Sequence, residues 1–181
     1  MSSRPRSAPV WSEDQATSDK PEDGTPALRK MLLAAKPSDF GLAPTAELPR
    51  VWAAMMEWQV GKTAVSLVAV AEGSTSLYFS TGGGIIGGGE HESVRVENRK
   101  LLAFVEKSLE MFVPMASPLP VVKDAVTFTV LTYDGTRGAR DKEEQITRQK
   151  SPLWPVYAIG QEIITALRLM TQKPSGSEPR V

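Results

Sequence analysis

The sequence predicts an α+β domain built on an antiparallel five-stranded sheet, in the order helix, three-strand meander, helix, hairpin, helix. Two observations support this class. Apolar, β-branched segments occur in groups separated by short turns, and three other segments repeat their apolar residues at helical spacing. Strands that cluster in hairpins, rather than alternating singly with helices, are typical of antiparallel sheets.

The expected domain limits follow from composition. Residues 1–26 are rich in Ser, Pro, Thr and acidic residues and hold few large apolar side chains, so we expect a disordered N-terminal tail. A single domain is expected over residues 27–172, followed by a second disordered tail at 173–181. The first element of the domain is a short amphipathic helix from Ala27 to Lys36, which Pro37 ends.

The meander follows this helix. Apolar residues alternate from Arg50 to Val60, which favours a strand, although the region from Trp52 to Trp58 also fits one face of a helix. The segment Thr63–Ala71 is apolar on both faces, as in a central strand that helices cover on at least one side. A third strand is expected at Ser76–Thr81.

The second half predicts a helix, a hairpin and a helix. Apolar residues recur at helical spacing from Val94 to Phe112. A strong strand is expected at Ala125–Tyr133, and its return strand at Thr136–Lys142 is polar, which indicates a sheet edge. Residues 141–150 are expected to form a mixed-charge loop before a last helix, which runs from Pro155 past Met170.

Composition excludes several classes of function. Lys and Arg number 21, as do Asp and Glu, and this balance argues against a generic binder of nucleic acid or anionic membranes. With no cysteine and one histidine, disulfides, thiolate chemistry and multi-histidine metal sites are excluded, so we expect neither metal nor cofactor. No segment is long and apolar enough to span a bilayer, which favours a cytoplasmic protein.

The segment Thr81–His91 is the strongest candidate site, because it holds six of the fourteen glycines and the only histidine. Glycine at this density lets the backbone approach a ligand or a partner closely. We therefore predict a binding site formed by the following residues: Gly82, Gly83, Gly84, Gly87, Gly88, Gly89, Glu90 and His91.

This segment has competing interpretations. Residues 82–87 fit the pattern G-x-G-x-x-G of dinucleotide sites, but Glu90 and Glu92 at the start of the next helix would repel a phosphate. A turn capped by acidic residues is the simpler reading. His91 between two glutamates suggests an acid/base pair or a metal site, but an exposed imidazole is favoured over both.

The stretch SLYFSTGGGIIGGGEH at residues 76–91, with the TYDG turn at 132–135, resembles a pattern found in uncharacterised bacterial proteins of similar length. The resemblance extends from about Lys36 to Met170. It implies that the glycine segment is characteristic of that family, which has no assigned activity, so it carries over no catalytic residue. In topology alone, the element order is similar to roadblock, longin and profilin domains.

Two functions are compatible with these features. We expect a non-enzymatic cytoplasmic adaptor or regulatory domain that acts through protein contacts, with a protein partner or as a homodimer. The alternative is a sensor in which the backbone of Gly82–Gly89 wraps a small ligand or nucleotide. An enzyme is less favoured, because no nucleophile or metal set accompanies Glu90 and His91. Neither a nucleic-acid nor a membrane partner is expected.

Overall fold

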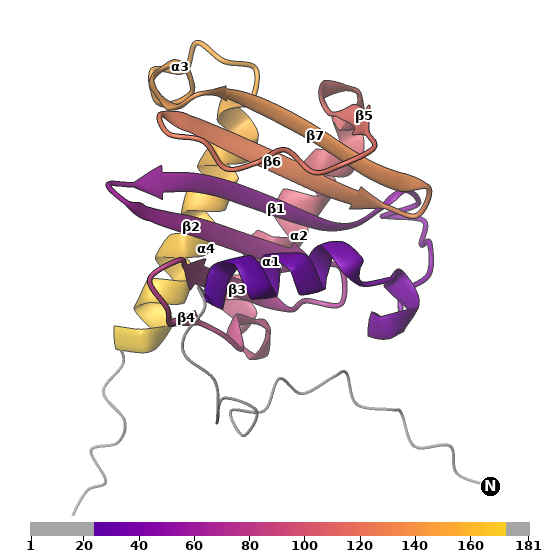
Figure 1. Cartoon of the computed structure of the whole chain (residues 1–181). Helices are drawn as coiled ribbons and strands as arrows, with labels where there is room; N and C mark the ends of the chain where they lie inside the picture. The colour runs from indigo at the N-terminus through magenta and orange to yellow at the C-terminus, as the bar shows by residue number, and fades with distance from the viewer. Residues whose placement is uncertain (1–23, 173–181) are drawn as a thin grey trace, which may run out of the picture.

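The computed structural model describes residues 24–172, which form a seven-stranded antiparallel sheet with helices on both faces (Figure 1). The expected tails lie outside these residues except for 24–26. The strands are β1 (Val51–Val60), β2 (Thr63–Val70), β3 (Thr75–Phe79), β4 (Gly84–Ile85), β5 (Val113–Met115), β6 (Ala125–Thr132) and β7 (Gly135–Lys142). The α-helices are α1 (Gly24–Ala34), α2 (Glu92–Lys107), α3 (Glu143–Thr147) and α4 (Trp154–Gln172), and the 3₁₀ turns are η2 (Pro37–Phe40), η3 (Gly88–Glu90) and η4 (Leu109–Met111).

The prediction of five strands was wrong, because β4 and β5 extend the sheet at its two edges to give the order β4-β3-β2-β1-β6-β7-β5. β4 has two residues and lies in the glycine segment, whereas β5 has three and contains Pro114. Strands this short show no alternation of apolar and polar residues. Only their pairing with β3 and β7 makes them strands.

Two other predictions in this region were wrong. β7 is not an edge strand throughout, because β5 pairs with its residues Thr136–Gly138. The expected loop at 141–150 contains the end of β7 and the five-residue helix α3. α3 buries a single apolar side chain, Ile146, so the sequence carries no helical repeat there.

The predicted meander and hairpin are confirmed. β1 is a strand and not a helix, and it lies at the centre of the sheet between β2 and β6. Its position joins the β1-β2-β3 meander to the β6-β7 hairpin in one sheet. A register shift between Val51 and Ala53 interrupts the ladder to β6 at the start of β1.

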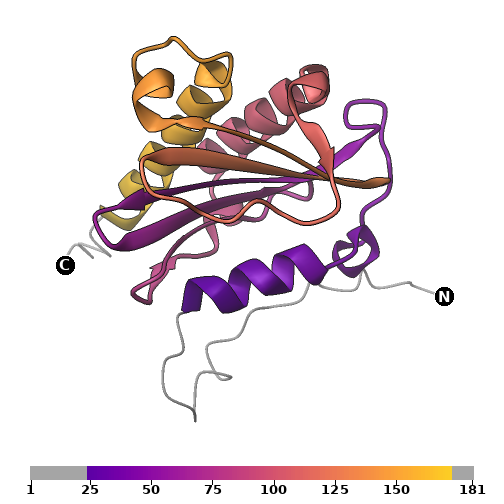
Figure 2. The ribbon, with the colours of Figure 1, turned by 45° about the horizontal axis from the view of Figure 1, so that its top comes forward.

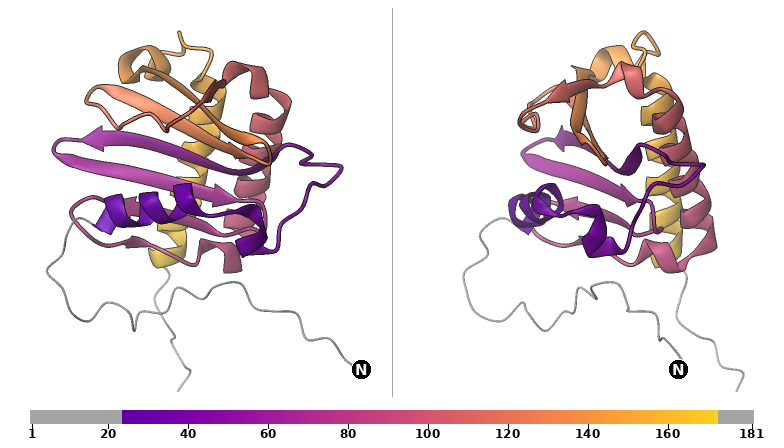
Figure 3. Two further views of the ribbon diagram at one scale, coloured as in Figure 1. Left: turned by 45° about the vertical axis from the view of Figure 1, so that its right-hand side comes forward. Right: turned by 90° about the vertical axis from the view of Figure 1, so that its right-hand side faces the viewer.

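Helices cover the two faces unequally. α2 and α4 lie side by side on one face, and α1 crosses the other (Figures 2 and 3). Residues 116–124, which we call the connector, link β5 to β6 and cross the same face as α1 (Figure 1). We call this the α1 face. Its sheet surface is shared between one short helix and an extended chain.

The two faces differ in chemistry. The face under α2 and α4 is a continuous apolar core that includes Met56, Leu67 and Phe128. The α1 face has a smaller apolar cluster around Trp52, which packs against Phe40 with ring centroids 5.8 Å apart. Because side chains alternate along a strand, the rest of this face is set by the intervening residues, several of which are polar.

Candidate functional site

The glycine segment, Thr81–His91, lies between β3 and α2 and contains β4 and η3. Gly82, Gly83 and Gly87 have positive φ angles of 94°, 78° and 81°. Residues other than glycine rarely adopt this backbone conformation. These three glycines form the turns on either side of β4. Their backbone geometry explains their identity without a ligand.

Gly88 shows a second use of glycine, close packing. It is buried, and a Cβ atom there would collide with Leu167 of α4 and lie 3.0 Å from the carbonyl oxygen of Thr75. Similarly, a Cβ on Gly89 would lie 2.6 Å from the carbonyl oxygen of Gly73, and one on Gly84 would collide with the backbone of Leu77. The segment therefore fits tightly against β3, the β2–β3 turn and α4.

The polar end of the segment points to solvent. Glu90 and His91 are both exposed. The carbonyl oxygen of His91 accepts hydrogen bonds from the backbone N–H groups of Val94 and Arg95. His91 is therefore the N-cap of α2, and its side chain makes no capping hydrogen bond. The structure therefore places the predicted site residues in one continuous segment that contains two turns, β4 and η3 and in which Gly88 is buried, and their role in binding stays a prediction.

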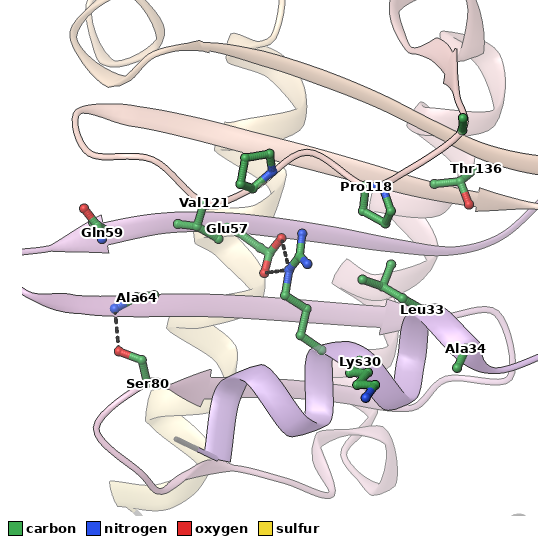
Figure 4. Close-up of a pocket in the computed structure, with 13 residues that line it drawn as sticks. Lys30, Leu33, Ala34, Glu57, Gln59, Ala64, Ser80, Pro118, Val121 and Thr136 are labelled. Carbon is green, nitrogen blue, oxygen red and sulfur yellow. Dashed lines mark hydrogen bonds and ion pairs between the residues drawn. The ribbon is translucent and has the colours of Figure 1, made fainter. Parts of the chain in front are cut away.

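A surface cavity lies in a different region of the molecule. A cavity of about 730 Å³ lies on the α1 face, between α1 on one side and the connector on the other (Figure 4). Its floor is formed by β1 and β2, and it runs along β1 from Gln59 toward Thr136. No residue of the glycine segment lines it. We call this cavity the α1 groove.

The lining of the α1 groove combines apolar surface with polar side chains. Leu33 and Ala34 come from α1, whereas Pro118 and Val121 come from the connector. The polar side chains that line it are those of Arg29, Lys30, Glu57, Gln59, Ser80 and Thr136. Apolar walls together with polar groups that can orient a ligand are typical of small-molecule sites.

Glu57 lies at the floor of the groove and is 0% exposed. Its Oε1 accepts hydrogen bonds from Arg29 Nε at 2.9 Å and from Ser66 Oγ at 3.0 Å. Its Oε2 accepts one bond, from the same Arg29 Nε at 3.1 Å. One N–H group is thus shared by both oxygens, which is weaker than the two-pronged contact that arginine makes with its separate N–H groups.

Burial determines the acidity of this carboxyl. It raises the pKa of Glu57 above its ordinary value, although the charge of Arg29 and the hydrogen bonds from Arg29 and Ser66 act in the opposite direction. The two donor side chains therefore do not fully replace the water that a carboxylate loses on burial. An ionised Glu57 would gain from any further donor.

The cross-strand register explains how Glu57 came to lie among polar side chains. Ser66 and Thr127 are directly opposite Glu57 on the two neighbouring strands, and Tyr78 and Arg140 are the next partners outward. Residues opposite one another share a face. The five residues form a polar row across the α1 face, and Glu57 is its centre.

Two arginines fasten the connector above this row. Arg29 Nη2 donates to the carbonyl oxygen of Leu119 at 2.6 Å, and Arg140 donates to the carbonyl oxygen of Pro120. Arg29 thus reaches from α1 to Glu57 on the floor and to the opposite wall. Its side chain crosses the groove, and 23% of that side chain is exposed.

A second buried glutamate has a different environment. Glu106 of α2 accepts hydrogen bonds from the backbone N–H groups of Arg50 and Val51, at 3.0 and 2.8 Å, and from Arg50 Nε at 2.5 Å. Burial by itself would raise the pKa of Glu106, but these bonds outweigh it and hold the pKa below its ordinary value. This carboxylate is held by Arg50 and by the first residue of β1, Val51, and it does not line the α1 groove.

Sequence analysis singled out neither Glu57 nor Arg29. A signal existed, because Glu57 is the one charged residue in the ten-residue strand VWAAMMEWQV. A charged side chain within an otherwise apolar central strand needs a partner. Arg29, which is 28 residues away, could not be named as that partner from the sequence.

No histidine lines the α1 groove. Ser66 Oγ donates to Glu57, and the chain's only histidine, His91, lies outside the groove at the start of α2. Across residues 24–172, no group of three or more His, Asp or Glu side chains is placed to hold a metal ion. Within the same residues, every helix is too short or too polar to cross a bilayer.

Comparison of the chain with protein-family models, with curated proteins and with solved structures finds no match. The resemblance of residues 76–91 to an uncharacterised family, and the topological likeness to roadblock, longin and profilin domains, therefore stay predictions. The functional argument rests on the geometry of the chain itself.

Proposed function

We propose that this protein is a non-enzymatic cytoplasmic domain that binds a small organic ligand in the α1 groove. The observation that carries the proposal is the groove itself, a cavity of about 730 Å³ with a buried Glu57–Arg29 ion pair at its floor. Ligand sites measure roughly 300–1,000 Å³ and combine apolar walls with a few polar groups. The proposal keeps the ligand-sensor alternative of the sequence analysis but moves the site from Gly82–Gly89 to the α1 face.

Stability supplies a second argument. An ion pair taken out of water is generally no more stabilising than an apolar pair of the same volume, because desolvation offsets the attraction between the charges. The fold therefore does not need charges at positions 29 and 57. A ligand that uses them gives a reason for their presence.

The test is a thermal-shift screen of the full chain against a chemically diverse set of metabolites. A ligand at about one hundred times its Kd stabilises the folded state by about 2.7 kcal/mol, which is a readily measured rise in Tm. Ala64→Phe places an aromatic ring on the floor of the groove and should abolish that rise. Thr165→Phe, at an exposed position of α4 beyond the other face, is the matched control and should retain it.

The proposal fails if no compound stabilises the chain, or if the Ala64→Phe variant responds to every ligand as strongly as the Thr165→Phe control does. Both variants must first unfold cooperatively on heating, which shows that each is folded. A ligand whose effect survives Ala64→Phe binds elsewhere.

A contact with a protein partner through the glycine segment is a second candidate function. The observation that favours it is Ile86, which is 54% exposed between two tight glycine turns. Ile86→Glu should lower the recovery of a stoichiometric partner from a native lysate. The control is Val113→Glu, which changes an equally exposed apolar residue on β5. Equal recovery with both variants would rule out this surface.

A further inference from the structure

Resting on the proposed function, we propose that the ligand of the α1 groove is a small zwitterion with a protonated amine and a carboxylate, inserted between Glu57 and Arg29. The amine binds Glu57, and the guanidinium of Arg29 turns to the carboxylate. Free amino acids and short peptides both have this chemistry. The inference concerns the class of ligand, and four features of the groove support it.

The first feature is the spare capacity of Glu57. A carboxylate offers about four lone-pair positions, and among residues 24–172 the donors to Glu57 are Arg29 Nε and Ser66 Oγ. Its Oε2 has one shared bond of 3.1 Å. An ammonium group carries three N–H donors on a compact cation, so it can bind Oε2 while Ser66 keeps its bond to Oε1.

The second feature is the position of Arg29, which covers Glu57 from above. Glu57 is fully buried although it lines the groove, so a ligand reaches it only if the guanidinium moves. Arg29 is held by side-chain bonds to Glu57 and by the carbonyl oxygen of Leu119. Rotation of its own side chain frees it without any change in the strands of the sheet.

The third feature is the charge balance. A ligand with an amine alone would displace Arg29 and leave a half-buried guanidinium without its carboxylate. A ligand with a carboxylate alone would draw Arg29 away and leave Glu57 buried and unpaired, which is costly. A zwitterion replaces one ion pair by two, so each buried charge keeps an opposite partner. Lys30 at the rim adds a second cation for the ligand's carboxylate.

The fourth feature is the apolar wall. Leu33, Pro118 and Val121 face the space beside the Glu57–Arg29 pair (Figure 4). An apolar side chain of the ligand would be removed from water against these residues, at roughly 25 cal/mol per Å² of buried apolar surface. The cavity has room for a dipeptide as well as for a single amino acid.

The experiment is a calorimetric titration of the full chain with four probes that share an isobutyl group. They are L-leucine, 3-methylbutylamine, 4-methylpentanoate and the dipeptide Leu-Leu. The second probe lacks the carboxylate of leucine, and the third lacks the amine. We expect leucine or Leu-Leu to bind at least about tenfold more tightly than either singly charged probe, since a hydrogen-bonded charge contributes about that factor. The stronger of the two zwitterions identifies the source.

Variants assign the two contacts. Glu57→Gln keeps the shape of the side chain but removes its charge, and it should weaken the zwitterion at least about tenfold. Arg29→Met should do the same, and it should abolish the advantage of leucine over 3-methylbutylamine. Glu97→Gln and Arg99→Met change charged residues on the solvent side of α2, and as matched controls they should leave binding unchanged.

The outcomes separate this inference from the proposed function. The inference is overturned if 3-methylbutylamine or 4-methylpentanoate binds as tightly as leucine and Leu-Leu do. It is also overturned if none of the four probes binds while the metabolite screen yields a ligand that Ala64→Phe abolishes, and in that case the proposed function stands. If no screened compound binds in the groove, both proposals fall.

Discussion

Glu57 and Glu106 are both buried and both pair with an arginine, yet the donors that surround them are of different kinds. Glu106 is held by two backbone N–H groups at the start of β1 in addition to Arg50. Within the described part of the chain, the donors to Glu57 are the side chains of Arg29 and Ser66. Burial acts to raise the pKa of both carboxyls, but the hydrogen bonds from the Arg50 side chain and from the two backbone N–H groups lower the pKa of Glu106, whereas the pKa of Glu57 stays raised.

The difference separates a structural carboxylate, Glu106, whose donors are fixed, from an exchangeable one, Glu57, whose paired cation can be replaced. A backbone N–H cannot move away without unfolding of its strand, so the contacts of Glu106 are part of the fold. A side-chain donor can rotate, so Arg29 can leave Glu57 when another cation takes its place. In addition, Glu57 lines the α1 groove and Glu106 does not.

The largest effect is expected from removal of the structural carboxylate. Glu106→Ala leaves the backbone N–H groups of Arg50 and Val51 without an acceptor, and it should lower the free energy of unfolding by about 3–5 kcal/mol. Urea denaturation followed by tryptophan fluorescence measures this change. Glu110→Ala, at an exposed position nearby, should cost less than about 0.5 kcal/mol. Equal costs for the two variants would refute the structural role.

Removal of the exchangeable carboxylate should cost less. Glu57→Ala leaves no buried backbone donor unpaired, and Arg29 remains bonded to the carbonyl oxygen of Leu119. We expect a loss of about 1–3 kcal/mol in the same urea measurement, mainly from the desolvated Arg29 and Ser66. A loss as large as that of Glu106→Ala would show that the two pairs are equivalent, and the comparison would then fail.

A double replacement sharpens the contrast. Glu57→Leu with Arg29→Met exchanges the ion pair for an apolar pair, and the stability should stay within about 1 kcal/mol of the parent chain while ligand binding is lost. The matched variant, Glu106→Leu with Arg50→Met, should remain strongly destabilised because the backbone donors still lack an acceptor. If this second variant is also as stable as the parent chain, the backbone bonds of Glu106 do not matter for the fold.

The smallest effect lies in the pH dependence, where the two carboxyls should have opposite signs. The pKa of Glu57 is raised in the folded state, so its contribution to stability is complete below the unfolded pKa of about 4.3 and is lost as pH rises through the folded pKa. The pKa of Glu106 is lowered, so its contribution is present above that value and is lost as pH falls through the folded pKa.

The variants should separate these slopes. The stability of Glu57→Gln relative to the parent chain should rise with pH, whereas that of Glu106→Gln should fall. Urea denaturation at a series of pH values from 3 to 7 checks both. Slopes of the same sign would contradict the difference in coordination. Arg29 is the charged group that bonds directly to Glu57, and Arg140 lies in the same polar row.

The longer elements were predictable from local patterns. The apolar repeat from Val94 to Phe112 predicted α2, although this helix ends at Lys107 and the 3₁₀ turn η4 follows it, and the alternation from Arg50 to Val60 predicted β1. These patterns work because residues at a fixed spacing share one face of a helix or of a strand over many residues. β4 and β5 are too short to repeat a pattern, and their pairing partners lie in distant parts of the chain or across a glycine turn.

The candidate sites show the same division. The sequence by itself determined that residues 82–91 form an unusual glycine turn, because glycine composition is a local property. Only the tertiary structure showed that Gly88 and Gly89 are used for packing against α4 and the β2–β3 turn. Glycine is required at these two positions because of neighbouring residues that lie far away in the sequence.

The sequence by itself determined an α+β chain with its main helices and strands, since those follow from short-range periodicity. The tertiary structure alone decided that Arg29 reaches Glu57, 28 residues away, and Leu119, 90 residues away. The α1 groove exists because α1 and the connector cover the same sheet face without filling the space between them. Burial, and therefore the acidity and binding capacity of Glu57, depends on which distant segments cover it.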